Sequence, residues 1–172
     1  MVIINEEWRS INCYINYQVS NVGRVRNSKT GRILKPNLGG NGYFTVGLSK
    51  NGGVKTHMIH QLVAREFLRN PNDKPCIDHI DGNKTNNSLD NLRLCSYSQN
   101  NRNSSKRENT SSIYKGVCWD KSLGKWKAQI QINSRQKSLG LFTNEKEAAQ
   151  AYNEKAKEHF KDFAKLNIIE NG

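Results

Sequence analysis

The sequence predicts an α+β chain: a small β-rich module at the N-terminus, a second module of strands and helices, and a C-terminal three-stranded antiparallel sheet with one helix. Short alternating segments separated by Gly-containing turns fill residues 8–56, and apolar residues then change to helical spacing. The segment RNSSKRENTSS, residues 102–112, contains no apolar residue, which is typical of a linker. The expected modules are 1–56 (β-rich), 57–103 (mixed core), 104–112 (linker) and 113–172 (sheet and helix).

Basic residues outnumber acidic ones by a wide margin. The 172 residues include 27 Lys and Arg against 15 Asp and Glu, which gives a formal charge of +12 and a pI of about 9.7. A polyanionic partner such as double-stranded DNA fits this excess, although a solvated basic surface or a membrane-surface protein would show it too. The start of the chain has no signal-peptide pattern, and no stretch approaches the roughly 18 apolar residues of a membrane span. We therefore expect an intracellular protein with no membrane partner.

The four cysteines are scattered and form no C-x-x-C pair. This spacing favours neither a disulfide framework nor a zinc knuckle. Cys76 and Cys95 could share a zinc ion with His79, but unpaired thiols are more often small buried hydrophobic residues. We therefore expect no zinc site.

The N-terminal module carries charge of one sign. From Ser20 to Lys55 the chain has seven Lys and Arg and no Asp or Glu. Such a bias suggests a surface that faces phosphate groups. Arg24 and Arg26, in the segment YQVSNVGRVR, are the candidates for contact with DNA.

The next module begins with a predicted helix and continues as strand, loop, strand and helix. Helical spacing covers residues 57–68, with Thr56 available as an N-cap. In CIDHIDGNKTNNSLDNLRLCSYSQNN, Asp78 and His79 close a short apolar strand, and a polar loop follows. A second strand covers residues 92–95, and a capped helix then begins. Asn100 lies in its first turn, where it could face the strand that bears His79.

This segment, with His60 on the preceding helix, resembles the HNH endonuclease family. It is similar in particular to phage-type homing endonucleases, whose motif contains D-H-x-D-G-N, then N-L-R, then a final Asn. The resemblance covers residues 57–103. The segments EEWRSI and YQVSNVGRVRN also look like the small NUMOD-type module that commonly precedes this nuclease. The resemblance implies a ββα-metal nuclease core that hydrolyses phosphodiester bonds in DNA.

The resemblance also implies a catalytic role for each matching residue. His79 would be the general base that activates water for attack on phosphorus. Asp78 and Asn100 would be the oxygen ligands of one divalent ion, Mg²⁺ or Mn²⁺. Asn91 would hold the loop and orient the strand that bears His79. His60 matches a family histidine, but a core histidine that satisfies a hydrogen bond is an equally good interpretation.

Three strands and one helix are predicted after the linker. In the segment KWKAQIQIN apolar residues alternate with Lys and Gln, and Asn144-x-x-Glu147 resembles a capping box before an Ala-rich helical face. Between Tyr114 and Lys137 there are six Lys and Arg and one Asp, whereas residues 144–162 have four Lys against five acids. The sheet, rather than the helix, is therefore expected to face an anion.

Residues 113–167 resemble the APETALA2-type DNA-binding domain of plant ethylene-response factors, in the pieces YKGV, GKWKAQI, LGLF, EAAQAYNEKA and AKLN. In that family the sheet lies in the major groove and the helix supports it from behind. The family positions imply contacts with DNA from Lys115, Trp119, Lys121, Lys127, Gln129, Gln131 and Lys137. Plant members carry several Arg on these strands, so their recognition sequence does not transfer.

The resemblance implies a homing endonuclease of a phage or mobile intron that acts on double-stranded DNA, with no protein partner implied. One motif per chain favours nicking by a monomer. Two alternatives stay open. A transcription factor with an inactive nuclease core would be expected to have lost a catalytic residue, and all are present; a restriction or defence nuclease would carry the same catalytic motif.

Overall fold

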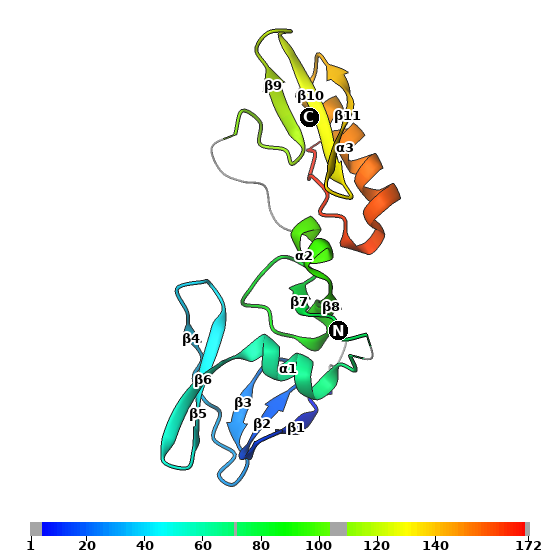
Figure 1. The fold of residues 1–172 in the computed structure, drawn as a ribbon. Helices are drawn as coiled ribbons and strands as arrows, with labels where there is room; N and C mark the ends of the chain where they lie inside the picture. Colours follow the sequence, from blue (N-terminus) through cyan, green and yellow to red (C-terminus); the bar gives the residue numbers. More distant parts are fainter. Residues whose placement is uncertain (1–4, 71, 104–109, 171–172) are drawn as a thin grey trace. The chain divides into compact units, whose positions relative to one another are not determined.

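The computed structural model describes residues 5–70, 72–103 and 110–170. The chain forms two compact units, Met1–Tyr97 and Ser98–Gly172, which are described separately (Figure 1). Residues 104–109 of the expected linker lie outside the described residues, and the expected module boundaries stay predictions. Within the described ranges, no helix is long and apolar enough to cross a membrane.

Two small antiparallel sheets open the first unit. Their strand orders are β1-β2-β3 and β4-β5-β6, so each strand pairs with its neighbour in the sequence. This pattern agrees with the β-rich module predicted from alternation and turns. The strands are β1 (Trp8–Ile11), β2 (Tyr14–Ser20), β3 (Val25–Asn27), β4 (Asn37–Leu38), β5 (Phe44–Lys50) and β6 (Gly53–Met58).

Helix α1 (Ile59–Phe67) follows β6 without a loop. Met58 occupies the N-cap position and makes no side-chain capping hydrogen bond. The predicted cap at Thr56 is wrong, because Thr56 lies in β6 opposite Gly47 of β5, and this pairing keeps the backbone extended as far as Met58.

A two-stranded antiparallel sheet completes the first unit. It consists of β7 (Cys76–His79) and β8 (Leu92–Cys95), with the short helix η1 (Leu89–Asn91) directly before β8. The predicted strand, loop and strand are therefore confirmed. The helix predicted after them is α2 (Tyr97–Asn103), whose residues belong to the second unit from Ser98 onward.

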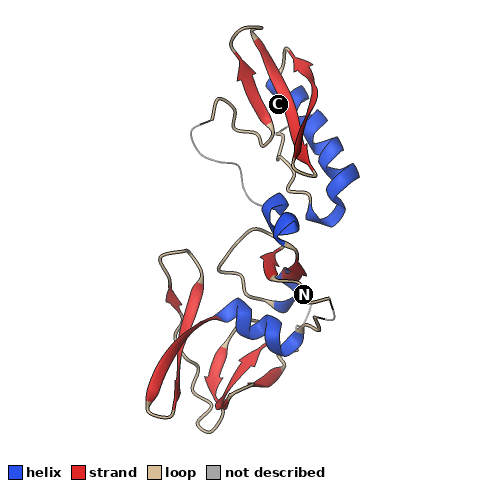
Figure 2. Cartoon of the chain, viewed as in Figure 1, coloured by secondary structure: helices blue, strands red, loops and turns tan. Residues whose placement is uncertain are grey.

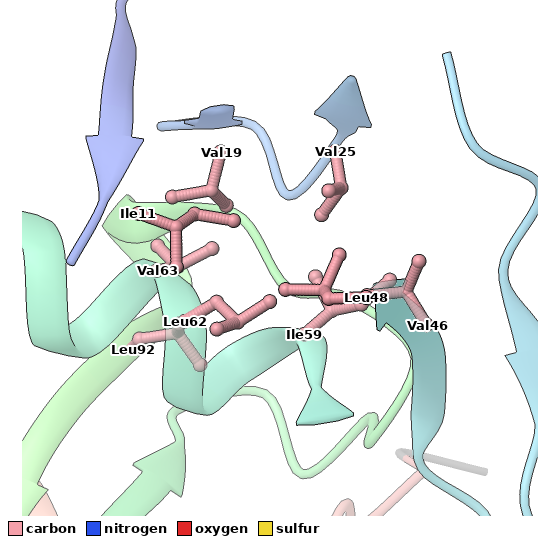
Figure 3. Packing of buried hydrophobic residues seen from close by; sticks show 9 residues of the cluster. All are labelled: Ile11, Val19, Val25, Val46, Leu48, Ile59, Leu62, Val63 and Leu92. Atoms are coloured by element: carbon pink, nitrogen blue, oxygen red, sulfur yellow. The ribbon is translucent and has the colours of Figure 1, made fainter. Parts of the chain in front are cut away.

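One hydrophobic core joins the sequence segments of the first unit (Figure 3). Apolar side chains from β1, β2, β3 and β5 pack against α1 and Leu92 of β8. A two-stranded sheet is marginally stable by itself in water, so β7 and β8 depend on these contacts. The buried members are Ile11, Val19, Val25, Val46, Leu48, Ile59, Leu62, Val63 and Leu92.

The second unit contains the predicted three-stranded sheet and helix (Figure 2). The strands β9 (Val117–Asp120), β10 (Lys125–Ile132) and β11 (Arg135–Phe142) pair in the order β11-β10-β9. Helix α3 (Glu145–Phe160) is followed by η2 (Lys161–Phe163). Asn144 caps α3, since its Oδ1 accepts a hydrogen bond from the Lys146 backbone at 2.8 Å. The predicted Ala-rich face is buried: Ala148, Ala149, Tyr152, Ala156 and Phe160.

Candidate active site

The end of β7 carries a buried carboxylate and a buried imidazole at successive positions of the chain. Asp78 and His79 are each only 5% exposed. Asp78 pairs with Arg93 of β8, whose Nη2 and Nε lie 2.7 and 2.8 Å from Asp78 Oδ2. Because both side chains are largely buried, the ion pair is screened little by solvent and holds the carboxylate in place.

His79 lies in a cluster of three rings that come from separate segments of the chain. The ring of His60, on α1, lies edge-on to the His79 ring with centroids 5.1 Å apart. Tyr43, just before β5, contacts both, with centroids 4.8 Å from His60 and 5.8 Å from His79. His79 Nε2 lies 3.3 Å from Oδ1 of the buried Asn87. The structure therefore brings the predicted residues His60 and His79 together, whereas the carboxylate of Asp78 lies against Arg93.

Asn91 makes hydrogen bonds at both ends of its side chain to the loop between β7 and β8. Its Nδ2 donates to Asp81 Oδ1 and to the Asn86 carbonyl, each at 2.9 Å, and its Oδ1 accepts from the Asp81 backbone at 3.0 Å. Burial opposes the charge on Asp81, but hydrogen bonds from Asn86, Asn83 and Asn91 hold its pKa below the usual value. These contacts fit the predicted role of Asn91 in holding the loop, which itself stays a prediction.

His60 is buried without a hydrogen bond at Nδ1 from any of the described residues. Burial, and then the charge of His79, lowers the pKa of His60 to about 4. The imidazole is therefore neutral near pH 7. The interpretation of His60 as a core histidine with a satisfied hydrogen bond is not supported at this nitrogen.

We expect the first unit to lose stability as the pH falls from the ordinary histidine pKa of 6.5 to about 4. In this window the unfolded chain binds a proton at His60 and the folded chain does not. The free energy of unfolding therefore falls by about 3 kcal/mol in total. Replacing His60 by Leu removes this part of the pH dependence, whereas the same change at the exposed His159 does not. Urea unfolding near neutral pH and near pH 4.5 measures the difference. Equal pH slopes for wild type and His60→Leu would contradict the burial argument.

Asn100 is an exposed residue of α2 and belongs to the second unit. Its predicted role as a metal ligand stays a prediction. In the part of the chain that the structure describes, no group of three His, Cys, Asp or Glu could hold a metal ion.

Arg24 and Arg26, the predicted DNA contacts of the N-terminal module, have partners inside the first unit. Arg24 forms an ion pair with Glu6. Arg26 stacks on Trp8, with its guanidinium carbon 4.1 Å from a ring centroid, and donates to Gln18 at 2.8 Å. Contacts with DNA from these two residues stay predictions.

The second unit presents a polar outer face on its sheet. Ala128, Ile130 and Ile132 of β10 are buried in the cores that contain α3, so the alternating residues point away from the helix. Lys127, Gln129 and Gln131 therefore share the outer face, as predicted from the alternation.

Two predicted DNA contacts lie on the opposite face of this sheet. Trp119 is in register with Trp126, and their ring centroids are 4.9 Å apart. Lys137 pairs with Ile130, because an irregularity in the pairing after Ala128 shifts β11 by one residue. Paired residues share a face, so Lys137 lies on the face of Ile130. Register therefore separates Trp119 and Lys137 from the face of Lys127 and Gln129.

The remaining two candidates of the second unit lie outside the strands. Lys121 is exposed in the turn between β9 and β10. Lys115 is partly buried, and Asn167 holds its backbone with hydrogen bonds of 2.6 and 3.0 Å. Burial, and then the charge of Lys165, lowers the pKa of Lys115 to about 8.

Two family models match parts of the chain from β1 to α2. Residues 57–102 match the model of the HNH endonuclease family, and residues 6–49 match the NUMOD4 motif. Residues 57–102 are thus similar to an HNH endonuclease domain. These two matches agree with the predicted nuclease core and the module before it.

Proteins similar to this chain occur in phages and in a giant virus. It is 44% identical over 94 residues to an uncharacterized HNH endonuclease, L245, of Acanthamoeba polyphaga mimivirus, covering 55% of this chain and 28% of the relative. It is 41% identical over 102 residues to the DNA endonuclease I-HmuI of Bacillus phage SP01, covering 59% of each. The H-N-H endonuclease F-TflII of Escherichia phage T5 is 36% identical over 89 residues, which are 51% of this chain and 46% of that protein.

A solved structure of I-HmuI, described as "DNA binding and cleavage by the HNH homing endonuclease I-HmuI", is similar to this chain with a TM-score of 0.53 and 42% identity. The similarity covers 56% of each chain. The chain thus spans less than two thirds of the length of these relatives.

Proposed function

We propose that this chain is a homing endonuclease that hydrolyses phosphodiester bonds of double-stranded DNA with one divalent ion, Mg²⁺ or Mn²⁺. The observation that carries this proposal is the buried pair Asp78 and His79 at the end of β7, inside the domain that matches the HNH model. The names of I-HmuI and F-TflII, both endonucleases, support the same activity.

His79 is the general base in this proposal. A neutral imidazole takes a proton from water as the water oxygen attacks phosphorus, and histidine is the side chain that enzymes use most often as a general base. The bond between phosphorus and the 3′ oxygen breaks, and the products are a 5′-phosphate and a 3′-hydroxyl. The packing of His60 and Tyr43 against His79 limits movement of its ring. His60, a matching family residue, acts through this contact.

Asp78 supplies a carboxylate of the kind that a hard divalent ion prefers. Mg²⁺ usually keeps several waters and binds one or two protein carboxylates together with phosphate oxygens, so a site with one carboxylate fits it. The bound ion would neutralise charge on the phosphate and stabilise the leaving oxygen. Asn100 is proposed as the second oxygen ligand on the sequence resemblance alone.

The outer face of the C-terminal sheet is proposed to read DNA sequence. Lys127, Gln129 and Gln131 project from this face, and glutamine can form two hydrogen bonds with adenine. The proposal that this unit is of the APETALA2 type depends on the sequence resemblance and on the presence of three strands and a helix.

Replacing Gln129 by Ala is expected to relax the preference at a particular base pair by about 1–3 kcal/mol if its contact is bidentate. Gln150→Ala is the matched control, because Gln150 is an exposed residue of α3. Binding-site selection with the full chain in the absence of divalent metal measures the preference. A profile identical to that of wild type would remove Gln129 from the reading face.

Incubation of the folded protein with supercoiled plasmid tests the proposed function. Nicked or linear product should form with Mg²⁺ or Mn²⁺ and should not form with EDTA. A transcription factor with an inactive nuclease core would bind the plasmid and leave it supercoiled.

A further inference from the structure

Asn87, a residue of the loop between β7 and β8, contacts the proposed general base through its side-chain amide. It is 5% exposed, and its Oδ1 lies 3.3 Å from His79 Nε2. The amide nitrogen donates to the Thr85 carbonyl at 3.2 Å. Because a carbonyl only accepts hydrogen bonds, the nitrogen of this amide must face Thr85, and its oxygen must face His79.

This orientation determines which tautomer of His79 fits the site. The Asn87 oxygen is an acceptor, so His79 Nε2 must carry a hydrogen and donate it. A neutral imidazole with its hydrogen on Nε2 has its lone pair on Nδ1. Asn87 therefore selects Nδ1 of His79 as the nitrogen that accepts a proton from water.

The position of Asn87 depends on a turn of the N-terminal module. Gly23 in that turn has a φ of +82°, and a Cβ atom placed on it would lie 2.8 Å from Asn87 Cβ and 3.0 Å from the Asn87 carbonyl oxygen. The backbone of Leu89, two residues after Asn87, donates to the Asn21 carbonyl at 2.7 Å. The turn and the loop are thus in direct contact.

The turn itself is held by short-range hydrogen bonds. The Ser20 backbone donates to the Arg24 carbonyl at 2.8 Å, and the Arg24 backbone donates to the Ser20 hydroxyl at 3.0 Å. Ser20 is fully buried, and Val19 and Val25 on either side of the turn belong to the core of the first unit. The turn is therefore a fixed support for the loop that carries Asn87.

We propose that Asn87 is a positioning residue for His79 and that the turn Ser20–Arg24 holds Asn87 in its place. The segment that matches the NUMOD4 motif then contributes to catalysis by holding Asn87 against His79, in addition to any contact that it makes with DNA. This inference rests on the proposed role of His79 as general base.

The first test compares wild type with Asn87→Ala in the full chain. Nitrogen-15 NMR of the His79 imidazole, recorded without metal or DNA, should show the Nε2–H tautomer in wild type and a loss of that preference in the variant. The single-turnover cleavage rate should fall about 10–100-fold, a part of the 10²–10⁴-fold that a general base contributes. The Kd for DNA should stay within about twofold, because the contact acts on the transition state rather than on binding.

Two glycine variants test the role of the turn. Gly23→Ala should shift the His79 tautomer signal and lower the rate, because the new methyl group collides with Asn87. Gly31→Ala is the matched control: Gly31 has a φ of +71°, and a Cβ there meets nothing within 4 Å. Both substitutions introduce the same kind of backbone strain, but only the first displaces Asn87. In a background that already carries Asn87→Ala, Gly23→Ala should add little further loss of rate, since both changes act on the same contact.

Each outcome separates this proposal from the proposed function. An unchanged tautomer signal and rate in Asn87→Ala would overturn the positioning role while leaving the nuclease intact. Equal effects of Gly23→Ala and Gly31→Ala would overturn the role of the turn. If wild type cleaved no DNA, the proposed function would fail, and the NMR comparison would still decide whether Asn87 sets the tautomer of His79.

Discussion

Replacing His79 by Ala is expected to lower the rate of DNA cleavage by about 10²–10⁴-fold. In the proposed mechanism the imidazole removes a proton from the attacking water, so its loss would raise the energy of the transition state. DNA affinity should stay within a few fold, since the base contributes little to ground-state binding. Single-turnover cleavage of supercoiled plasmid and a parallel measurement of Kd separate these two quantities.

His159→Ala is the matched control for this experiment. His159 is an exposed residue of α3 in the second unit, and the same loss of an imidazole there should leave the rate unchanged. Full activity in His79→Ala would contradict its assignment as the base. A comparable loss in both variants would show that the effect does not belong to the candidate active site.

Replacing Asp78 by Asn is expected to reduce metal-dependent cleavage by about 10²-fold or more, because the charge of the proposed metal ligand is lost. The asparagine keeps the size of the side chain and an oxygen that can accept from Arg93. Loss of the charged partner should still cost stability of about 1–3 kcal/mol, since Arg93 is mostly buried. Calorimetric titration with Mn²⁺ should show weaker binding in the variant.

The control for Asp78→Asn is the same substitution at Asp90. Asp90 is exposed in η1, and its loss removes one negative charge without changing the site. Circular dichroism confirms that each variant is folded before its activity is compared. An Asp78→Asn protein with wild-type Mn²⁺ affinity and wild-type rate would rule out Asp78 as a metal ligand.

The elements that carry local sequence signals could be predicted. Alternation in β10 and four-residue spacing in α3 both reflect burial on one face, so the sequence alone predicts these elements. The end of β6 could not be predicted in this way. Thr56 has the side chain of a helix cap, but pairing with Gly47 keeps it in a strand, and that pairing depends on tertiary structure.

The candidate site could also be predicted only in part, because a sequence shows local signals but not contacts between distant segments. Asp78 and His79 are neighbours in the sequence, and the motif predicts both. Asn87 could not be predicted, because an Asn in such a loop usually only forms a turn. Its contact with Gly23 joins segments that are distant in the sequence. Tyr43 carries no sequence signal for its contact with His79.

Charge counts also have a limit that the structure makes clear. Arg24 and Arg26 were counted as basic residues of a phosphate-facing surface, but their partners Glu6 and Trp8 lie outside the segment that was counted. Family position predicts Lys137 on the DNA face, whereas the irregular pairing after Ala128 sets it opposite Ile130; its contact with DNA stays a prediction. The sign and number of charges thus predict the type of partner. The register of strand pairing decides which side chains share one face of the sheet and could contact that partner together.

Metal-dependent cleavage by the wild-type chain tests the central claim most directly. The substrate is a pool of supercoiled plasmids with randomised inserts, so that a specific target is represented, and sequencing of captured ends maps each cut. The account predicts cuts that carry 5′-phosphate ends, appear with Mg²⁺ or Mn²⁺ and disappear with EDTA or in His79→Ala. Cleavage that persists in EDTA, or the absence of any cut by folded protein supplied with either metal, would contradict it.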